Sequence, residues 1–175
     1  MIVVLISTLL GLMTEVSAHD ADALRSTAPD YLTVETAAQH LGAARVAGLV
    51  TGTDPTLLLS IAWHESRYDH RARTAEPGGK ISCGVMTPVP MTPSACRDTS
   101  LVASYVLGAQ HLRGWLSASQ DLHTALIGYA GGYVGIAFCR DARNARDYRC
   151  GTSWVFLDRA RRIRHAISRA SVGTS

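Results

Sequence analysis

The sequence has little charge and almost no lysine, and both shortages narrow the classes of protein that it can encode. Only 18% of its 175 residues are charged, whereas 47% are apolar. A chain this apolar can bury enough surface to fold, which excludes a disordered, collagen-like or low-complexity protein. Its length suits one domain around a single core. Sixteen of the 17 basic residues are arginine, and the net charge is only +3. This excess is too small for a nucleic-acid-binding surface, so no nucleic-acid partner is expected.

The chain also lacks the short motifs of several common enzyme classes. It contains no G-x-S-x-G elbow, no phosphate-binding G-x-x-x-x-G-K loop and no G-x-G-x-x-G dinucleotide signature. His64-Glu65 resembles the start of a zinc-protease helix, but the position four residues after His64 is Tyr68. Two imidazoles therefore cannot share that helix face. We expect neither a metal nor a cofactor.

Residues 1–18 have the pattern of a secretory signal peptide. An apolar run is followed by a polar stretch and by small residues at Val16 and Ala18. No Lys or Arg precedes the run, which departs from the usual pattern. Because the run is shorter than the ~20 residues of a membrane span, we favour export over a short membrane anchor. The mature protein is then periplasmic or extracellular, and no later segment is expected to cross a bilayer.

Four cysteines, an even number in an exported chain, indicate two disulfides. Metal binding is disfavoured, because neither a C-x-x-C pair nor a histidine at ligand spacing accompanies them. Three connectivities are open. We prefer Cys83 with Cys96 and Cys139 with Cys150, because each pair brackets one short irregular stretch.

Helical periodicity dominates the chain after a polar stretch over residues 19–32, which we interpret as a flexible lead-in. Apolar residues at helical spacing predict a mainly α domain over residues 33–170, with a tail over 171–175 and helices over about 33–51, 55–68, 99–116, 121–130 and 153–168. Prolines and glycines exclude a long helix between residues 69 and 98 and allow at most a hairpin around 81–89. A loop of this length is typical of a binding surface.

The second predicted helix carries a carboxylate at the end of its apolar face. Leu58, Ile61 and Glu65 fall at i, i+3 and i+7. Partial burial and the negative end of the helix dipole both disfavour the ionised form, so we expect a raised pKa for Glu65. A carboxylic acid that stays protonated near neutral pH can protonate a glycosidic oxygen. Alternatively, Glu65 reaches solvent or pairs with Arg67 or Arg71.

This glutamate belongs to the first of four short motifs that follow one another along the chain in a characteristic order. They are the Glu65-Ser66 pair at a helix end, Gly84-Val85-Met86 one loop later, the helix from Tyr105 to Leu112, and Gly128-Tyr129-Ala130-Gly131-Gly132. Together they resemble the lytic transglycosylases of the soluble-transglycosylase, goose-lysozyme-like superfamily, over about residues 52–150. The resemblance implies a lysozyme-like helical domain in which a long loop or small β-hairpin lines the cleft.

The resemblance also implies a role for each matched residue. Glu65 is expected to be the only catalytic acid and base, and Ser66 to hold the substrate sugar or the glutamate. Met86 belongs to the family's G-x-M-Q loop, whose methionine lines the sugar cleft. Tyr129 is expected to face Glu65. Tyr148, in the segment Asn144-Ala145-Arg146-Asp147-Tyr148, is similar to a further family tyrosine.

Two positions depart from the family pattern. Thr87 stands where the loop usually has Gln, and Ala130 stands where the turn usually has Asn. A threonine hydroxyl can replace one hydrogen bond of an amide, whereas alanine can replace none. The candidate substrate-binding residues are therefore Ser66, Gly84, Val85, Met86, Thr87, Tyr129 and Tyr148.

The family cleaves the β-1,4 bond between N-acetylmuramic acid and N-acetylglucosamine in peptidoglycan without water and leaves a 1,6-anhydromuramic product. We expect the same reaction here, from a monomer whose partners are glycan strands, with wall-spanning machinery as a further candidate partner. Two alternatives stay open. One is a lysozyme-type hydrolase of the same fold, with Asp69 as the residue that activates water. The other is a catalytically silent glycan-binding or assembly protein, which the changes at Thr87 and Ala130 would explain.

Overall fold

The computed structural model describes residues 16–87, 96, 99–144 and 146–172. These residues form a mainly helical fold with one small antiparallel hairpin, so the predicted fold class is confirmed at this level. The helices are α2 (Ala18–Ser26), α3 (Val34–Thr51), α4 (Pro55–Ser66), α6 (Leu101–Ser119), α7 (Leu122–Arg140) and α8 (Thr152–Val172). The hairpin consists of β1 (Arg73–Glu76) and β2 (Lys80–Cys83), and short 3-10 turns lie at Pro77–Gly79 and Ala142–Asn144.

Local capping sets the helix boundaries. Each of five helices begins after a residue whose side chain accepts a hydrogen bond from a backbone N–H of the first turn: Ser17, Thr33, Asp54, Ser100 and Asp121. Pro55 then occupies the first turn of α4, where its missing N–H costs nothing. Helix α4 ends because Arg67 and Tyr68 adopt left-handed φ angles of 57° and 65°. Glu65 consequently lies in the last turn of α4.

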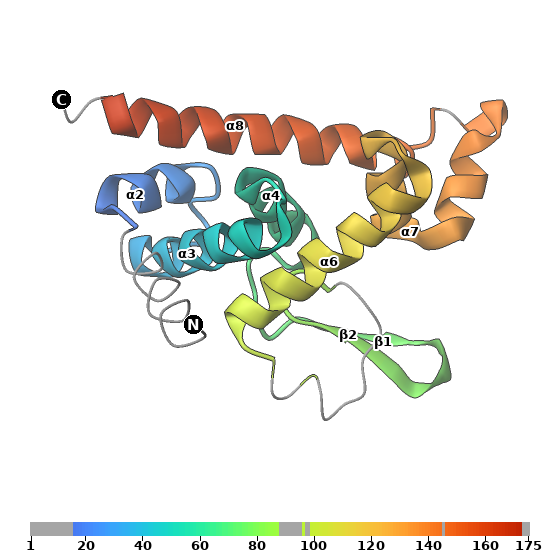
Figure 1. Ribbon diagram of the computed structural model, residues 1–175, viewed down its shortest axis with the longest axis horizontal. Coiled ribbons are helices and arrows are strands. Elements are labelled where there is room, and N and C mark those ends of the chain that lie inside the picture. Colours follow the sequence, from blue (N-terminus) through green and yellow to red (C-terminus); the bar gives the residue numbers. More distant parts are fainter. Residues whose placement is uncertain (1–15, 88–95, 97–98, 145, 173–175) are drawn as a thin grey trace.

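Helix α4 is the central element of the fold and packs against α3, α6 and α8. Figure 1 shows α8 running along one side of the molecule and the hairpin projecting from the opposite side. The Ser60 hydroxyl donates to the Phe156 carbonyl (2.7 Å) and joins α4 to α8. His40 Nδ1 lies 3.0 Å from the Tyr105 hydroxyl and joins α3 to α6. These buried polar contacts fix the helices around the end of α4.

The region expected to be a flexible lead-in, residues 19–32, differs from that expectation because it contains α2. Ala21 and Leu24 are fully buried, and Arg45 pairs with Asp20 at 2.6 Å. Two buried apolar residues are too few to produce a visible helical period, so the tertiary contacts of α2 decide its conformation. Residues 1–15 of the predicted leader lie outside the described residues, as do 173–175 of the tail.

The hairpin lies upstream of the predicted position. It was expected around residues 81–89, but β1 pairs with β2 from Arg73↔Cys83 to Glu76↔Lys80. The intervening Gly78 and Gly79 adopt φ angles of 76° and 74°, which glycine alone tolerates readily. The same glycines that break a helix therefore make the tight turn of a hairpin here. Residues 88 and 89 lie outside the described part of the chain.

Helix α7 extends beyond its predicted end. The prediction ended this helix before Gly131, whereas α7 continues to Arg140 with a break at Gly132 (φ 62°, ψ −162°). Over its full length α7 is long and apolar enough to cross a membrane, which the sequence prediction did not anticipate. Length and composition are weak evidence for a span, because a core helix passes the same test. In this structure α7 packs against α6 and α8.

Both preferred disulfides are confirmed. Cys83 is bonded to Cys96, with their Cα atoms 5.9 Å apart, and Cys139 to Cys150, with theirs 5.4 Å apart. The first bond holds the end of β2, and the second holds the end of α7 close to the beginning of α8. Disulfides persist in oxidising compartments, so the pair supports an exported protein.

Candidate active site

Glu65 lies half-buried in the last turn of α4. Burial raises the pKa of its carboxyl group, and a hydrogen bond from Thr87 opposes part of that rise. The Thr87 hydroxyl donates to Glu65 Oε2 at 2.9 Å. The predicted direction of the pKa shift is confirmed, and its main cause is desolvation of the carboxylate.

Thr87 holds an uncommon backbone conformation. Its φ angle is 39°, in the left-handed region that β-branched residues rarely enter. Its N–H donates to the Gly84 carbonyl at 3.3 Å and closes a tight turn. Such a conformation costs about 1–3 kcal/mol and persists only where the surroundings enforce it. Here it accompanies a side-chain contact with the one acid of the site.

Two hydroxyl groups hold the 84–87 segment in place through its backbone. Ser66 donates to the Val85 carbonyl at 2.9 Å and is also 3.0 Å from the Ala62 carbonyl of its own helix. Tyr129, from α7, donates to the Met86 carbonyl at 2.6 Å. These donors come from the two helices that flank the segment. Ser66 and Tyr129 therefore position Thr87 beside Glu65.

The side chains of the same segment anchor it in the core. Val85 and Met86 are both completely buried. Gly84 has φ 81°, and a Cβ there would lie 2.4 Å from Ser104 Oγ. A Cβ on Gly108 of α6 would lie 2.5 Å from Met86 Cβ. The segment thus fits closely against α6, and both glycines are required by that approach.

A cavity of about 440 Å³ opens beside Glu65. Its volume falls in the range of ~300–1,000 Å³ that is usual for ligand pockets. Three apolar side chains of α7 form one wall: Ile127, Val134 and Phe138. The remaining described lining residues are His64, Glu65, Ala130, Gly131, Gly135, Cys139, Arg149 and Thr152. Among all of these, Glu65 is the only carboxylic acid.

Two basic side chains, His64 and Arg149, line the cavity together with Glu65. Burial, followed by the charges of Arg67 and Arg159, lowers the pKa of His64. A neutral imidazole next to Glu65 can donate or accept a hydrogen bond without neutralising the acid. Arg149 lies over the Phe138 ring at 4.1 Å and pairs with Asp147 at 2.9 Å. Its charge is therefore partly balanced outside the cavity.

The structure brings most of the predicted site residues together, but it changes the role of several. Glu65 lines the cavity, whereas Ser66, Gly84, Thr87 and Tyr129 are not among its lining residues. Thr87 contacts Glu65 directly, and Ser66 and Tyr129 hold the segment that begins at Gly84. Val85 and Met86 do not line the cavity, because their side chains are buried against the helices. The expectation that Met86 contacts sugar in the cleft therefore differs from the structure.

Tyr148 does not join the site. Its side chain is 84% exposed, and the neighbouring Arg149 lines the cavity in its place. The polar segment around Tyr148 offers few apolar contacts that could turn the ring inward. Tyr148 therefore does not line the cavity, contrary to the expectation.

Sequence reasoning missed the apolar wall of the cavity. Val134 and Phe138 lie four residues apart on one helix face, and Ile127 reaches the same cavity from the other side of the break at Gly132. This signal was hidden because Gly131-Gly132 indicated the end of the helix. Within the described ranges, no group of three or more His, Cys, Asp or Glu residues could hold a metal ion.

Comparisons with known proteins add no relative to this picture, since no family model, curated protein or solved structure matches the chain.

Proposed function

We propose that this protein is a peptidoglycan lytic transglycosylase with a lysozyme-like fold and with Glu65 as its catalytic acid and base. The observation that carries the proposal is the raised pKa of Glu65 in a cavity that no other described acid lines. A protonated carboxyl group beside an enclosed site is the arrangement needed to protonate a poor leaving group. The order of motifs from Glu65 to Gly132 supports the same assignment.

In the proposed reaction one carboxyl group serves twice. Glu65 donates its proton to the oxygen between N-acetylmuramic acid and N-acetylglucosamine as the bond from that oxygen to C1 breaks. The substrate's N-acetyl group stabilises the developing positive charge. The Glu65 carboxylate then accepts the proton of the muramyl C6 hydroxyl, whose oxygen bonds to C1. The products are a 1,6-anhydromuramic end and a free N-acetylglucosamine end, and no water is consumed.

The Thr87 hydrogen bond suits this double role. Burial favours the protonated carboxyl group before the first step, and the hydroxyl of Thr87 stabilises the carboxylate that the first step creates. Hydrogen bonds to a charged group are stronger than neutral ones, so the contact is stronger after proton transfer than before it. A hydroxyl group thus stands beside the acid at the position where the family that the sequence resembles has an amide.

A two-carboxylate hydrolase is less well supported. Hydrolases of that kind place two carboxyl groups about 5 Å apart, or roughly 6.5–9.5 Å apart, across the scissile bond. Asp69, the nearest downstream acid, is exposed and accepts a hydrogen bond from the Arg71 backbone N–H at 2.8 Å. It is not among the lining residues of the cavity. A single-acid mechanism therefore agrees better with the described residues.

Product analysis tests the proposal directly. Purified sacculi are digested with the wild-type protein, with Glu65→Gln and with Glu35→Gln, and the muropeptides are identified by mass spectrometry. Glu35 is an exposed acid in the first turn of α3 and provides a charge-matched control. We expect anhydro ends from the wild type and from Glu35→Gln, and none from a folded Glu65→Gln protein.

The other outcomes overturn the proposal in distinct ways. Reducing ends with one added water would indicate a lysozyme-type hydrolase. Intact glycan that the wild-type protein nevertheless binds would indicate a silent glycan-binding or assembly protein. Full activity in Glu65→Gln would remove Glu65 from the chemistry.

A further inference from the structure

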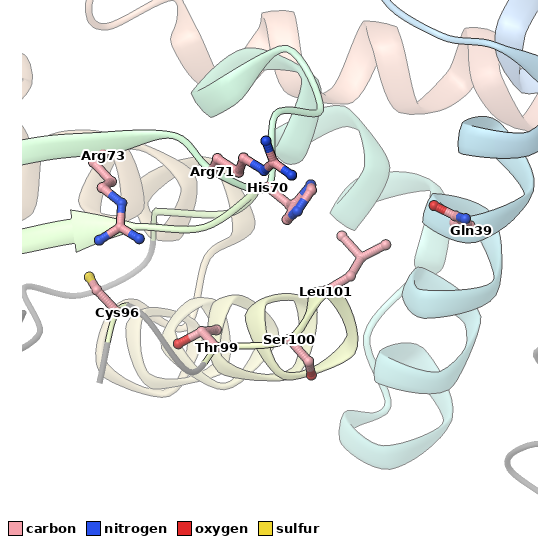
Figure 2. A pocket seen from close by; sticks show the side chains of 8 residues that line it. All are labelled: Gln39, His70, Arg71, Arg73, Cys96, Thr99, Ser100 and Leu101. Atoms are coloured by element: carbon pink, nitrogen blue, oxygen red, sulfur yellow. The ribbon is translucent and has the colours of Figure 1, made fainter. Parts of the chain in front are cut away.

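A second cavity, of about 580 Å³, lies between the hairpin, α3 and the beginning of α6. Its described lining residues are Gln39, His70, Arg71, Arg73, Cys96, Thr99, Ser100 and Leu101. None of them belongs to the cavity beside Glu65. Figure 2 shows Arg71, Arg73 and His70 on the hairpin side, Thr99 and Leu101 at the start of α6, Ser100 with its side chain pointing away from the hairpin side, and Gln39 on α3.

The lining of this cavity is cationic and contains no described acid. Arg71 and Arg73 form no ion pair with any described residue, whereas seven arginines elsewhere do. Asp69, the acid next to them in the sequence, accepts the backbone N–H of Arg71. Arg71 and Arg73 are both exposed, and an anion bound between two like charges offsets their mutual repulsion.

The other lining groups suit a small oxyanion. Guanidinium groups bind carboxylates through two parallel hydrogen bonds. The Gln39 amide adds a donor and an acceptor to the lining, and Thr99 adds a hydroxyl group. The Leu101 side chain and the Arg stems provide apolar contact for a short chain.

We propose that this cavity binds a short peptide through its carboxylates. Resting on the proposed function, we assign the ligand as the acidic peptide stem that branches from the glycan strand. The location supports this assignment, because Cys96 lines the cavity and is bonded to Cys83, the residue directly before the 84–87 segment. Arg73 is also the register partner of Cys83. The hairpin thus connects the anion-binding residues to the segment that holds Thr87 against Glu65.

A binding experiment tests the cavity without relying on catalysis. The full-length Glu65→Gln protein, which cannot turn over substrate under the proposed mechanism, is titrated by calorimetry with free stem tripeptide, with the same tripeptide amidated at its carboxylates, and with inorganic phosphate. We expect binding of the acidic tripeptide. We also expect the double variant, Arg71→Gln and Arg73→Gln together, to bind the acidic tripeptide at least about tenfold more weakly, because charge-assisted hydrogen bonds are lost.

Matched controls separate the cavity from general charge. Arg169→Gln removes one exposed positive charge on α8, at the other side of the molecule, and should leave tripeptide affinity unchanged. Equal binding of the amidated tripeptide, equal loss in Arg169→Gln, or binding of phosphate alone would each overturn the peptide assignment. Circular dichroism of each variant ensures that a loss of affinity is not a loss of fold.

An activity experiment distinguishes failure of this inference from failure of the proposed function. The wild type and the double arginine variant are assayed on stem-bearing glycan and on glycan whose stems an amidase has removed. We expect the double variant to lose about tenfold in kcat/KM on stem-bearing glycan only. Equal losses on both substrates would overturn the stem assignment. If neither substrate is cleaved by the wild type, the proposed function fails, and the binding experiment still decides whether the cavity takes acidic peptides.

Discussion

Thr87 donates its hydroxyl hydrogen to Glu65 Oε2 across 2.9 Å, from a backbone conformation that threonine rarely adopts. Ser66 and Tyr129 hold the adjoining carbonyls, so contacts with two separate helices, α4 and α7, set the position of this hydroxyl. One of the two residues that depart from the pattern of the resembled family is therefore in direct contact with the proposed catalytic acid.

Replacing Thr87 by valine should raise the pKa of Glu65 further. Valine keeps the branched shape but removes the donor that stabilises the carboxylate. A carbon-13 NMR titration of the Glu65 carboxyl measures the shift directly. In an activity assay the basic limb of the pH profile should move to higher pH, and turnover should fall about tenfold with the loss of a hydrogen bond to a charged group. Thr87→Ser keeps the donor and should restore both values; a valine variant that titrates like wild type would contradict the contact.

Glu65→Gln should stabilise the protein at neutral and alkaline pH. The folded-state pKa of Glu65 is raised, so the unfolded chain loses this proton at lower pH than the folded protein does. Stability from this group is complete below its ordinary pKa and is lost as pH rises through the raised one. Urea unfolding should show near-equal stability at about pH 4 and a more stable variant at about pH 8. Glu35→Gln should show no such divergence.

His40 should make the protein sensitive to acid. Burial lowers the pKa of His40 to about 4, and the charge of His70 adds to the effect. The unfolded chain therefore binds a proton between its ordinary pKa and about 4 that the folded protein refuses, and stability falls as pH falls through this window. The loss should reach about 3 kcal/mol. His40→Asn should flatten this part of the stability curve, whereas His165→Asn at the exposed surface of α8 should not.

Alanine substitutions at two glycines of α6 should change the stability of the protein in opposite directions. A Cβ at Gly108 meets Met86 Cβ at 2.5 Å, so Gly108→Ala should destabilise the protein by about 1–3 kcal/mol. No atom lies within 4 Å of a Cβ at Gly114. Gly114→Ala should therefore stabilise the same helix by about 0.5–1 kcal/mol. Thermal unfolding of both variants checks the pair, and a tolerated alanine at residue 108 would contradict the packing of Met86.

Removing the Cys139–Cys150 bond should lower stability without abolishing the fold. The bond closes a loop with a sequence separation of 11 residues. In the chain-entropy account such a loop contributes about 3 kcal/mol. Urea unfolding of the double alanine variant measures the loss. A double variant as stable as the oxidised protein would show that the loop is held by other contacts.

The sequence was sufficient for those elements whose signals are local. Asp54-Pro55 predicted the start of α4, and the i, i+3, i+7 spacing predicted that Glu65 would be partly buried. The cysteine pairs were predictable because each closes a short segment. In all these cases the residues that carry the signal lie close in sequence, within about three helical turns, to the element that they determine.

The rest could not be predicted because it depends on contacts between distant segments. Helix α2 is fixed by burial of Leu24 and by the pair of Arg45 with Asp20, neither of which appears in its local pattern. Met86 carries a family motif, but the space left by Gly108 draws it into the core. Tyr148, by contrast, is exposed where a site position was expected, because a motif cannot specify which of two neighbouring side chains turns inward.

The close fit at Gly84 and Gly108 constrains the sequence of any homologue of this protein. Any homologue that retains this close packing is expected to keep a glycine opposite Ser104 and another opposite Met86, even where the rest of the sequence diverges. The interval between these two glycines, combined with a helix-terminal Glu-Ser upstream, is a fingerprint that can be screened in genomes even where overall similarity has decayed. Loss of either glycine in a sequence that keeps the Glu-Ser pair would indicate that the segment corresponding to residues 84–87 packs less closely against α6.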